Sequence, residues 1–151
     1  MENNTVTVQT TVQAPIEKVW DCWSNPQHIT RWAFASDDWE APFAKNDLRT
    51  GGAFMTRMQA KGAPSGSAQE ADGFDFNGVY TNVVDYKIIE YDMEKGPGDE
   101  KARHVKITFT ETPNGVQVVE TFDPENENTL ELQRSGWQAI LDNFKKYTEA
   151  L

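Results

Sequence analysis

Hydrophobic and polar residues alternate along most of the chain with the two-residue period of β-strands. Val6, Val8 and Val12 share one parity near the start, with Thr and Gln between them, which predicts a half-buried strand over residues 5–12. The same alternation predicts further strands over residues 37–43, 53–58, 74–84, 86–93, 104–111 and 116–122. The last two should form a hairpin, because Asn114 and Gly115 between them both tolerate the positive φ of tight turns.

After the first strand the apolar residues change to helical spacing. Pro15 suits the first position of a helix, where its missing N–H costs nothing. The residues that follow at steps of three and four are Ile16, Val19, Trp20 and Trp23. Pro26 ends this helix, because the residue before a proline avoids the α region. A second short helix over residues 26–31 leads to Trp32.

The end of the chain carries the longest helical pattern, over residues 127–150. Its apolar face consists of Leu130, Trp137, Ile140, Leu141, Phe144, Tyr147 and Leu151. Residues 59–73 are rich in small and turn-forming residues and are predicted to be a mobile loop. Two short helices after the first strand, then strands, then a terminal helix indicate an α+β fold, with helices on one side of an antiparallel sheet.

Size and composition indicate one domain over residues 1–151 with a true core. The chain is 38% hydrophobic and contains five Trp and eight Phe. Its 24 acidic and 14 basic residues give a net charge of −10, so neither nucleic acid nor a membrane is expected as a partner. The polar N-terminus and the lone Cys22, which we expect to be a packed apolar residue, favour a cytoplasmic location.

Four short motifs, in order along the chain, resemble a known superfamily. The first resembles the START-like, helix-grip superfamily, also called SRPBCC or birch-pollen-allergen-like: Ala14-Pro15-x-x-x-Val19-Trp20, followed by Pro26 and Trp32. The other three are similar to its branch named for the activator of heat-shock-protein-90 ATPase: Gly51-Gly52-Ala53-Phe54-Met55, Gly73-Phe74-Asp75-Phe76-x-Gly78-x-Tyr80, and Gln133-Arg134-x-Gly136-Trp137-x-x-Ile140-Leu141-x-x-Phe144. The resemblance covers residues 6–151.

This resemblance implies a curved antiparallel sheet of six to seven strands around a long C-terminal helix. Between sheet and helix, members of the superfamily hold lipids, sterols, polyketides or plant hormones in a cavity. A true co-chaperone would resemble a larger protein with a second domain, so the name of the branch does not carry that role with it.

The sequence lacks the residues that several common kinds of functional site require. The chain has two histidines, His28 and His104, and one cysteine, so we expect no metal site. No phosphate-binding glycine loop precedes a helix, and no serine has the context of a hydrolase nucleophile. We therefore expect no cofactor.

The candidate site combines polar residues on otherwise apolar faces with aromatic walls. Arg57, Glu120 and Arg134 would orient a polar ligand group if they converge, because a buried charge requires partners. Alternatively, Arg134 reaches solvent and Glu120 pairs on the sheet surface. The remaining candidates for the cavity wall are Trp32, Trp39, Met55, Phe76, Tyr80, Trp137 and Leu141. Trp20 and Trp23 are interpreted as core packing.

Three functions remain open on this reading. The first is a binding protein for a hydrophobic, lipid-like or aromatic small molecule. The second is a cavity-based enzyme of the polyketide cyclase type, with Arg57, Tyr80 and Glu120 as candidate groups and the Tyr80 hydroxyl as a donor or general acid. The third is a chaperone-associated interaction module. Both a monomer and a homodimer agree with the sequence.

Overall fold

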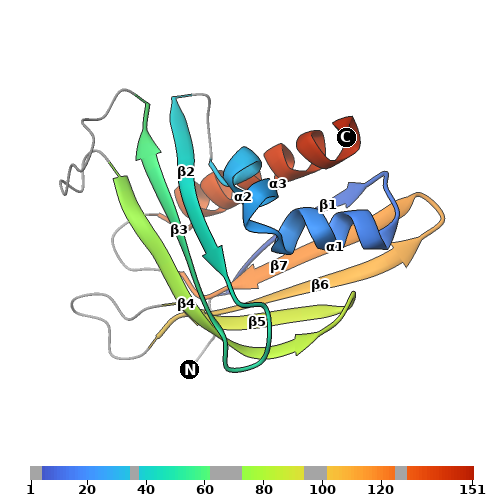
Figure 1. Cartoon of the computed structure of the whole chain (residues 1–151), viewed down its shortest axis with the longest axis horizontal. Helices are drawn as coiled ribbons and strands as arrows, with labels where there is room; N and C mark the ends of the chain where they lie inside the picture. Colours follow the sequence, from blue (N-terminus) through green and yellow to red (C-terminus); the bar gives the residue numbers. More distant parts are fainter. Residues whose placement is uncertain (1–4, 35–37, 62–72, 94–101, 125–128) are drawn as a thin grey trace.

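The computed structural model describes residues 5–34, 38–61, 73–93, 102–124 and 129–151 (Figure 1). Its elements are β1 (Val6–Val12), α1 (Ile16–Ser24), α2 (Pro26–Trp32), β2 (Trp39–Asn46), β3 (Ala53–Ala60), β4 (Gly73–Val84), β5 (Ile88–Met93), β6 (His104–Thr112), β7 (Gly115–Phe122) and α3 (Leu130–Ala150). The predicted order of strands and helices is confirmed.

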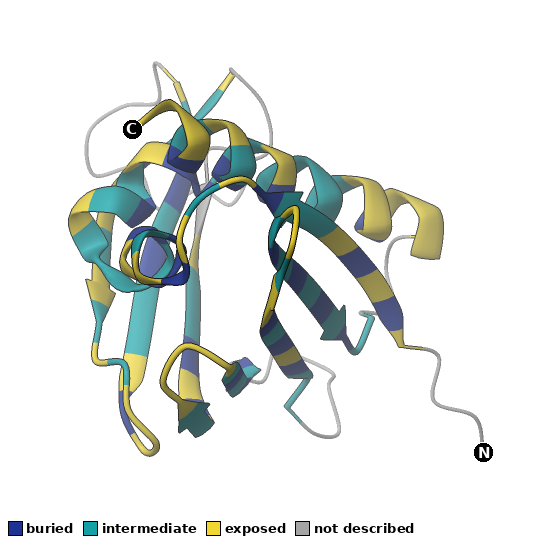
Figure 2. Cartoon of the chain, turned by 90° about the vertical axis from the view of Figure 1, so that its right-hand side faces the viewer, coloured by how far each residue is buried: buried dark blue, intermediate teal, exposed yellow. Residues whose placement is uncertain are grey.

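The seven strands form one antiparallel sheet in the order β1-β7-β6-β5-β4-β3-β2. The sheet curls into a half-barrel, and α3 lies across its concave side with α1 and α2 beside it (Figures 1 and 2). Buried residues alternate with exposed or half-buried ones along β5, β6 and β7, so one face of each strand points towards the helices. This is the expected α+β helix-grip architecture.

Two irregularities accompany the bend of the sheet. The pairing register shifts between Glu40 and Phe43 in β2, and again between Tyr80 and Asn82 in β4. An extra residue on one strand bends it and strengthens its twist. The bent strands therefore leave space between sheet and helix that a flat sheet would not enclose.

Several strand boundaries differ from the sequence prediction. Strand β2 begins at Trp39 and continues to Asn46, and β3 continues to Ala60. Tyr86 lies in a turn at φ 66° instead of opening a strand. Residues 62–72, most of the predicted mobile loop, lie outside the described residues. In the β6–β7 hairpin only Gly115 has positive φ, at 130°. Asn114 has negative φ, so the turn does not require its ability to adopt positive φ.

Each helix starts at a residue with extended backbone. Pro15 has ψ 153° and precedes α1, so it caps the helix and does not occupy its first turn. The Asn25 side chain accepts a hydrogen bond from Gln27 N at 3.0 Å, and Thr129 Oγ1 accepts one from Leu132 N at 3.1 Å. The last helix therefore begins at Leu130, later than the predicted residue 127. Within the described residues, no helix is long and apolar enough to span a membrane.

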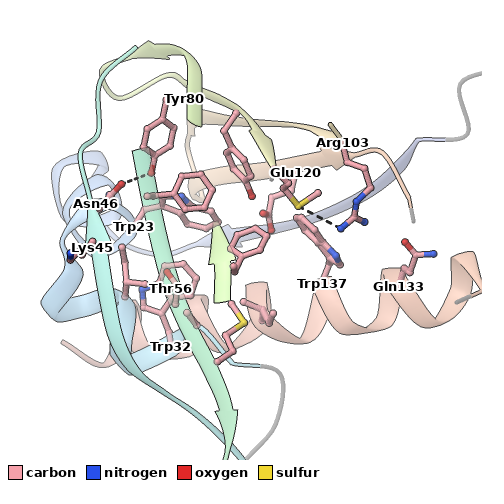
Figure 3. Close-up of a pocket in the computed structure, with 18 residues that line it drawn as sticks. Trp23, Trp32, Lys45, Asn46, Thr56, Tyr80, Arg103, Glu120, Gln133 and Trp137 are labelled. Atoms are coloured by element: carbon pink, nitrogen blue, oxygen red, sulfur yellow. Dashed lines mark hydrogen bonds between the residues drawn. The ribbon is translucent and has the colours of Figure 1, made fainter. Parts of the chain in front are cut away.

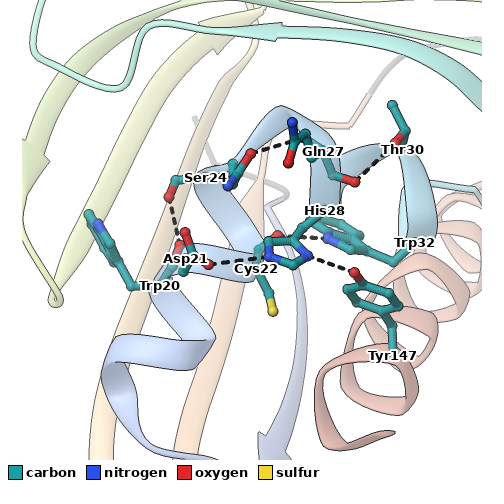
Figure 4. A network of polar contacts seen from close by, with 10 residues as sticks. Trp20, Asp21, Cys22, Ser24, Gln27, His28, Thr30, Trp32 and Tyr147 are labelled. Carbon is teal, nitrogen blue, oxygen red and sulfur yellow. Dashed lines mark hydrogen bonds and ion pairs between the residues drawn. The ribbon is translucent and has the colours of Figure 1, made fainter. Parts of the chain in front are cut away.

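A polar network ties the three helices together at one end of the fold (Figure 4). His28 Nδ1 lies 2.6 Å from the Tyr147 hydroxyl, and His28 Nε2 lies 3.2 Å from Asp21 Oδ2. Trp32 Nε1 donates to the Cys22 carbonyl at 2.8 Å. Cys22 itself is 1% exposed and packs in the core, as predicted. These bonds hold α1 and α2 against α3 and so position Trp32.

The buried face of α3 differs in part from its apolar pattern. Leu141 and Phe144 are fully buried, but Leu130 and Leu151, at the two ends of the helix, are exposed. Gln133 and Thr148 occupy the buried face instead, because they lie four residues before Trp137 and four after Phe144. A polar side chain of α3 is thereby placed next to the sheet.

Candidate ligand cavity

A cavity of about 460 Å³ lies between the concave face of the sheet and the helices α2 and α3 (Figure 3). Strands β2 to β5 and β7 contribute side chains to its wall, and so do the C-terminal part of α1 and the residue before β6. Most of the lining residues are aromatic or aliphatic. The space is therefore a largely apolar chamber built from segments distant in the sequence.

Strand alternation decides which side chains reach this chamber. On β3 the inward residues are Phe54, Thr56 and Met58, which all line the cavity. On β4 they are Phe76 and Tyr80, on either side of Gly78. Because successive side chains of a strand point to opposite faces, their neighbours lie on the convex side of the sheet.

Phe54 lies at the centre of an aromatic cluster on the sheet side of the cavity. Its ring centroid is 4.7 Å from that of Tyr91, 5.1 Å from Tyr80 and 5.5 Å from Phe76. Gly78 faces Phe54 across the β3–β4 pair, and a Cβ at Gly78 would lie 2.6 Å from the Phe54 ring. The missing side chain at residue 78 leaves the room that the ring occupies.

Trp137 forms the helix side of the same wall. Its ring stacks on Phe122 of β7, with centroids 3.8 Å apart and planes 12° from parallel. It also meets Phe76 edge-on at 6.3 Å. Aromatic rings in these geometries attract one another beyond their burial, so the indole is held firmly at the cavity surface.

The Tyr80 hydroxyl donates a hydrogen bond to Asn46 Oδ1 at one end of the cavity (Figure 3). Asn46 Nδ2 in turn donates to the Ser24 carbonyl at 2.6 Å. Burial raises the pKa of the Tyr80 hydroxyl above its ordinary value, and the bond to Asn46 opposes that shift. Tyr80 is therefore a neutral phenol, already engaged as a donor.

Glu120 lies on the opposite side of the chamber, on the inward face of β7. It is 5% exposed, and the other inward residues of that strand are Val116, Val118 and Phe122. No hydrogen bond or ion pair joins its carboxyl to another described residue. Burial raises the pKa of this carboxyl from 4.5 to about 8, because a buried charge loses its hydration. At neutral pH it is a carboxylic acid.

Five of the residues proposed from the sequence line the cavity: Trp32, Phe76, Tyr80, Glu120 and Trp137. Met55 and Arg57 do not, since they have the other parity on β3; Arg57 lies 3.5 Å from Asp75 on the opposite face. Assigning Arg57 to the cavity was wrong for this reason. Whether the five lining residues bind a ligand stays a prediction.

Three further proposed residues lie elsewhere. Arg134 is exposed on α3, because it lies one residue past the buried position of Gln133. Leu141 is fully buried among core residues, and Trp39 is half-buried against the core. Arg57, Glu120 and Arg134 therefore do not converge; Arg134 is exposed, as in the alternative, but Glu120 is buried instead of pairing on the sheet surface. Conversely, Trp23, which we interpreted as core packing, lies on the cavity wall.

The sequence analysis missed several lining residues, among them Phe54, Met58, Tyr91, Arg103 and Gln133. The apolar pair Phe54 and Met58 could have identified the inward parity of β3, because Arg57 has the opposite parity. Gln133 lies one turn before Trp137 and was identifiable from helical spacing. Arg103 precedes β6, and no periodic pattern around it indicates that it lines the cavity, so only the fold shows its position.

Neither histidine lines the cavity. His28 belongs to the network between the helices, and His104 lies 2.7 Å from Asp92 and 3.0 Å from Glu90 through its two ring nitrogens. Although His104 bonds to both carboxylates, no group of three His, Cys, Asp or Glu side chains among the described residues is arranged to hold a metal ion. The cavity is thus the part of the described structure best suited to a ligand.

A half-barrel that grips a long helix over a chamber defines the helix-grip class of proteins. Within that class, residues 13–149 match the model of the family described as Activator of Hsp90 ATPase homolog 1-like protein. The chain belongs to this family. The resemblance deduced from the four motifs is thereby confirmed.

Solved structures support the same assignment. The AHSA1-like protein from Aeromonas hydrophila is 40% identical, with a TM-score of 0.82 over 97% of this chain and 92% of that one. A protein from Cytophaga hutchinsonii is 49% identical, with a TM-score of 0.71 over 97% and 91% of the two chains. A protein from Chromobacterium violaceum shares the fold at 20% identity, with a TM-score of 0.78 over 98% and 99%. No curated protein matches the chain.

Proposed function

We propose that this protein binds a hydrophobic small molecule in the cavity between its sheet and α3. The observation that carries the proposal is the chamber of about 460 Å³ with its aromatic wall. Pockets for small molecules have volumes of about 300–1,000 Å³ and combine apolar walls with a few polar groups. This chamber has the size, the apolar wall and the isolated polar groups of such a site.

The arrangement of rings favours a ligand that itself contains a flat ring system. Phe54, Phe76, Tyr91 and Trp137 present faces and edges from both sides of the chamber. Ring pairs gain about 0.5–1.5 kcal/mol beyond the area they bury. A ring-bearing ligand would therefore gain more from this wall than an aliphatic chain of equal surface.

The enzyme alternative has less support from the geometry. Of the three groups suggested for catalysis, Tyr80 and Glu120 line the cavity but Arg57 lies on the other face of the sheet. The interaction-module alternative rests on the description of the family alone. Binding of a small molecule is therefore the function that we put to the test.

The test uses N-phenylnaphthylamine, an uncharged dye that fluoresces in apolar surroundings. Thr56→Phe places a ring inside the cavity, so the dye should bind about tenfold more weakly than to the wild type. Met55→Phe places the same ring on the opposite face of the same strand and serves as the matched control. Fluorescence titration measures both affinities, and thermal denaturation checks that both variants fold.

If the dye binds neither the wild type nor Met55→Phe, the proposal fails. It also fails if Thr56→Phe folds and binds the dye as tightly as the wild type, because the site would then lie outside the cavity. Native mass spectrometry of the freshly purified protein adds a second measurement. A retained apolar compound should be present in the wild type and reduced in Thr56→Phe.

A further inference from the structure

We propose that one end of the cavity, formed by Glu120, Arg103 and Gln133, is a subsite for a carboxylate group on the apolar ligand. The inference rests on the proposed function, since it concerns the chemistry of the molecule in the same chamber. Figure 3 shows these three side chains at one end of the cavity, beside Trp137. Asn46 and Tyr80 lie at the other end.

Glu120 is the first part of this subsite. The residue is 5% exposed, it lines the cavity, and its carboxyl has no hydrogen-bonding partner among the described residues. A buried polar group without a partner costs about 1–3 kcal/mol, so a ligand that bonds to it gains at least part of that cost. Since burial keeps the group protonated at neutral pH, it offers an O–H donor.

Arg103 is the second part. Its guanidinium contacts the Met93 sulfur at 3.8 Å, and no carboxylate of the described residues pairs with it. Thioether sulfur is a weak acceptor, so the described residues leave most of the donor capacity of this cation unused. Guanidinium and carboxylate groups match each other in shape and bond through two parallel N–H···O contacts.

The Tyr91 hydroxyl lies within electrostatic range of both Glu120 and Arg103. Burial raises the pKa of the Tyr91 hydroxyl well above its ordinary value. Of the charges near it, Glu120 and Tyr80 raise this pKa further and Arg103 lowers it. Both Glu120 and Arg103 therefore lie within electrostatic reach of one buried hydroxyl, in agreement with their placement in Figure 3.

The remaining groups around Glu120 do not neutralise Arg103. The residues paired with Glu120 on the adjacent strands are Val8 and Ile107, and α3 presents Gln133 and Trp137 to the cavity. None of these four titrates near neutral pH.

Lys45 also borders the cavity, but it is exposed and pairs with Met55 on the outward face of the sheet, so its charge lies outside the chamber. At pH 7 the charged side chain on the inner surface of the described wall is therefore the cation Arg103, inside a chain whose net charge is −10. A carboxylate would meet Arg103 as its counter-ion and the protonated Glu120 as a second donor. An ammonium group would be repelled by Arg103 and would require Glu120 to ionise, so it fits this end of the cavity less well.

The experiment compares three probes with the same ring: naphthylacetic acid, naphthylacetamide and naphthylethylamine. Calorimetric titration at about pH 6.5 should give about tenfold tighter binding of the acid than of the amide, the effect of one charge-assisted bond. Arg103→Met should remove that preference, and Arg49→Met, an exposed arginine paired with Asp47 outside the cavity, should retain it.

The variant Glu120→Gln distinguishes the contribution of Glu120 to binding of the acid from that of Arg103. Its amide still donates a hydrogen bond but does not ionise, so the acid should keep its advantage in this variant at about pH 6.5 and at about pH 9.5. In the wild type the advantage should disappear at the higher pH, because an ionised Glu120 repels the probe. Thermal denaturation confirms that each variant is folded before titration.

The relative affinities of the three probes decide whether the carboxylate subsite exists. Equal affinities for the acid and the amide in the wild type overturn the subsite but leave the proposed function intact. Preference for the amine overturns it as well and identifies Glu120 as an anionic site. If none of the three probes binds, the proposed function fails and the subsite fails with it.

Discussion

Glu120 occupies a position that the pattern of its strand assigns to an apolar residue. Val116, Val118 and Phe122 precede and follow it on the same face, and all four residues are buried. A carboxyl in such a place is tolerated in its neutral form, because ionisation would leave an unpaired charge away from water. This one residue therefore links the stability of the fold to pH.

The pKa of Glu120 predicts how stability changes with pH. In the folded protein the pKa is about 8 instead of the ordinary 4.5, so between these values the folded state holds a proton that the unfolded chain has lost. Stability is therefore greatest below the lower value and decreases as the pH rises towards the higher one. Relative to the wild type, Glu120→Gln should gain about 3 kcal/mol in free energy of unfolding between about pH 5 and about pH 8.

Urea denaturation at a series of pH values measures this difference. Glu111→Gln, an exposed glutamate on β6, is the control and should follow the wild type throughout. Parallel curves for the wild type and Glu120→Gln would show that Glu120 is ionised in the folded protein across this range.

At the scale of elements, the pairing of β3 with β4 builds the sheet side of the cavity. Gly78 lies directly opposite Phe54 in this pair, and neighbouring Phe76 and Tyr80 point inwards with the same parity. A side chain at residue 78 would meet the Phe54 ring at 2.6 Å and the Asp92 carbonyl at 2.7 Å. The carbonyl belongs to the backbone of β5 and has little freedom to move.

Replacing two of the five glycines in the family motifs, Gly78 and Gly136, should therefore have opposite effects. Gly78→Ala should cost about 2 kcal/mol, because the extra methyl group overpacks the interface of β4 with Phe54 and β5. Gly136→Ala, in α3, meets nothing within 4 Å and should gain about 0.5–1 kcal/mol from better helix propensity. Chemical denaturation compares both with the wild type. Equal effects of the two substitutions would contradict the proposed packing role of Gly78.

At the scale of the whole molecule, the distribution of charge differs between the chain and its cavity. The net charge is −10, yet the charged side chain on the inner surface of the described cavity wall at neutral pH is the cation Arg103. An excess of like charge destabilises a compact state through self-repulsion, and salt weakens that repulsion.

Raising the ionic strength should therefore stabilise the protein. From about 0.02 M to about 0.5 M sodium chloride, the melting temperature should rise by a few degrees, as the Debye length falls well below the protein diameter. Potassium chloride should act in the same way, because screening depends on ionic strength and not on the ion. A melting temperature that falls with salt would mean that ion pairs outweigh the repulsion.

Much of the fold was predictable because its signals are local. The alternation in β1, β6 and β7 and the helical spacing of Ile16, Val19 and Trp20 reflect short-range geometry. The ends of elements were less certain, as Tyr86 and Leu130 show, because turns and caps depend on single residues. Four motifs in the right order then sufficed to identify the family.

The candidate site was predictable only in part. Trp32, Phe76, Tyr80, Glu120 and Trp137 line the cavity as expected, because large or polar residues interrupting an apolar face are visible in the sequence. The assignment of Met55 and Arg57 was wrong, since alternation identifies two faces of a strand without stating which one is covered.

The sequence by itself determined the seven strands, the three helices and the family, because each depends on residues close together in the chain or on their order. Only the tertiary structure decided which face of β3 points inwards and which polar groups share one end of the cavity. Arg103, Glu120 and Gln133 come from a connecting segment, a strand and a helix. Their proximity follows from the curl of the sheet around α3, a long-range arrangement that no local pattern encodes.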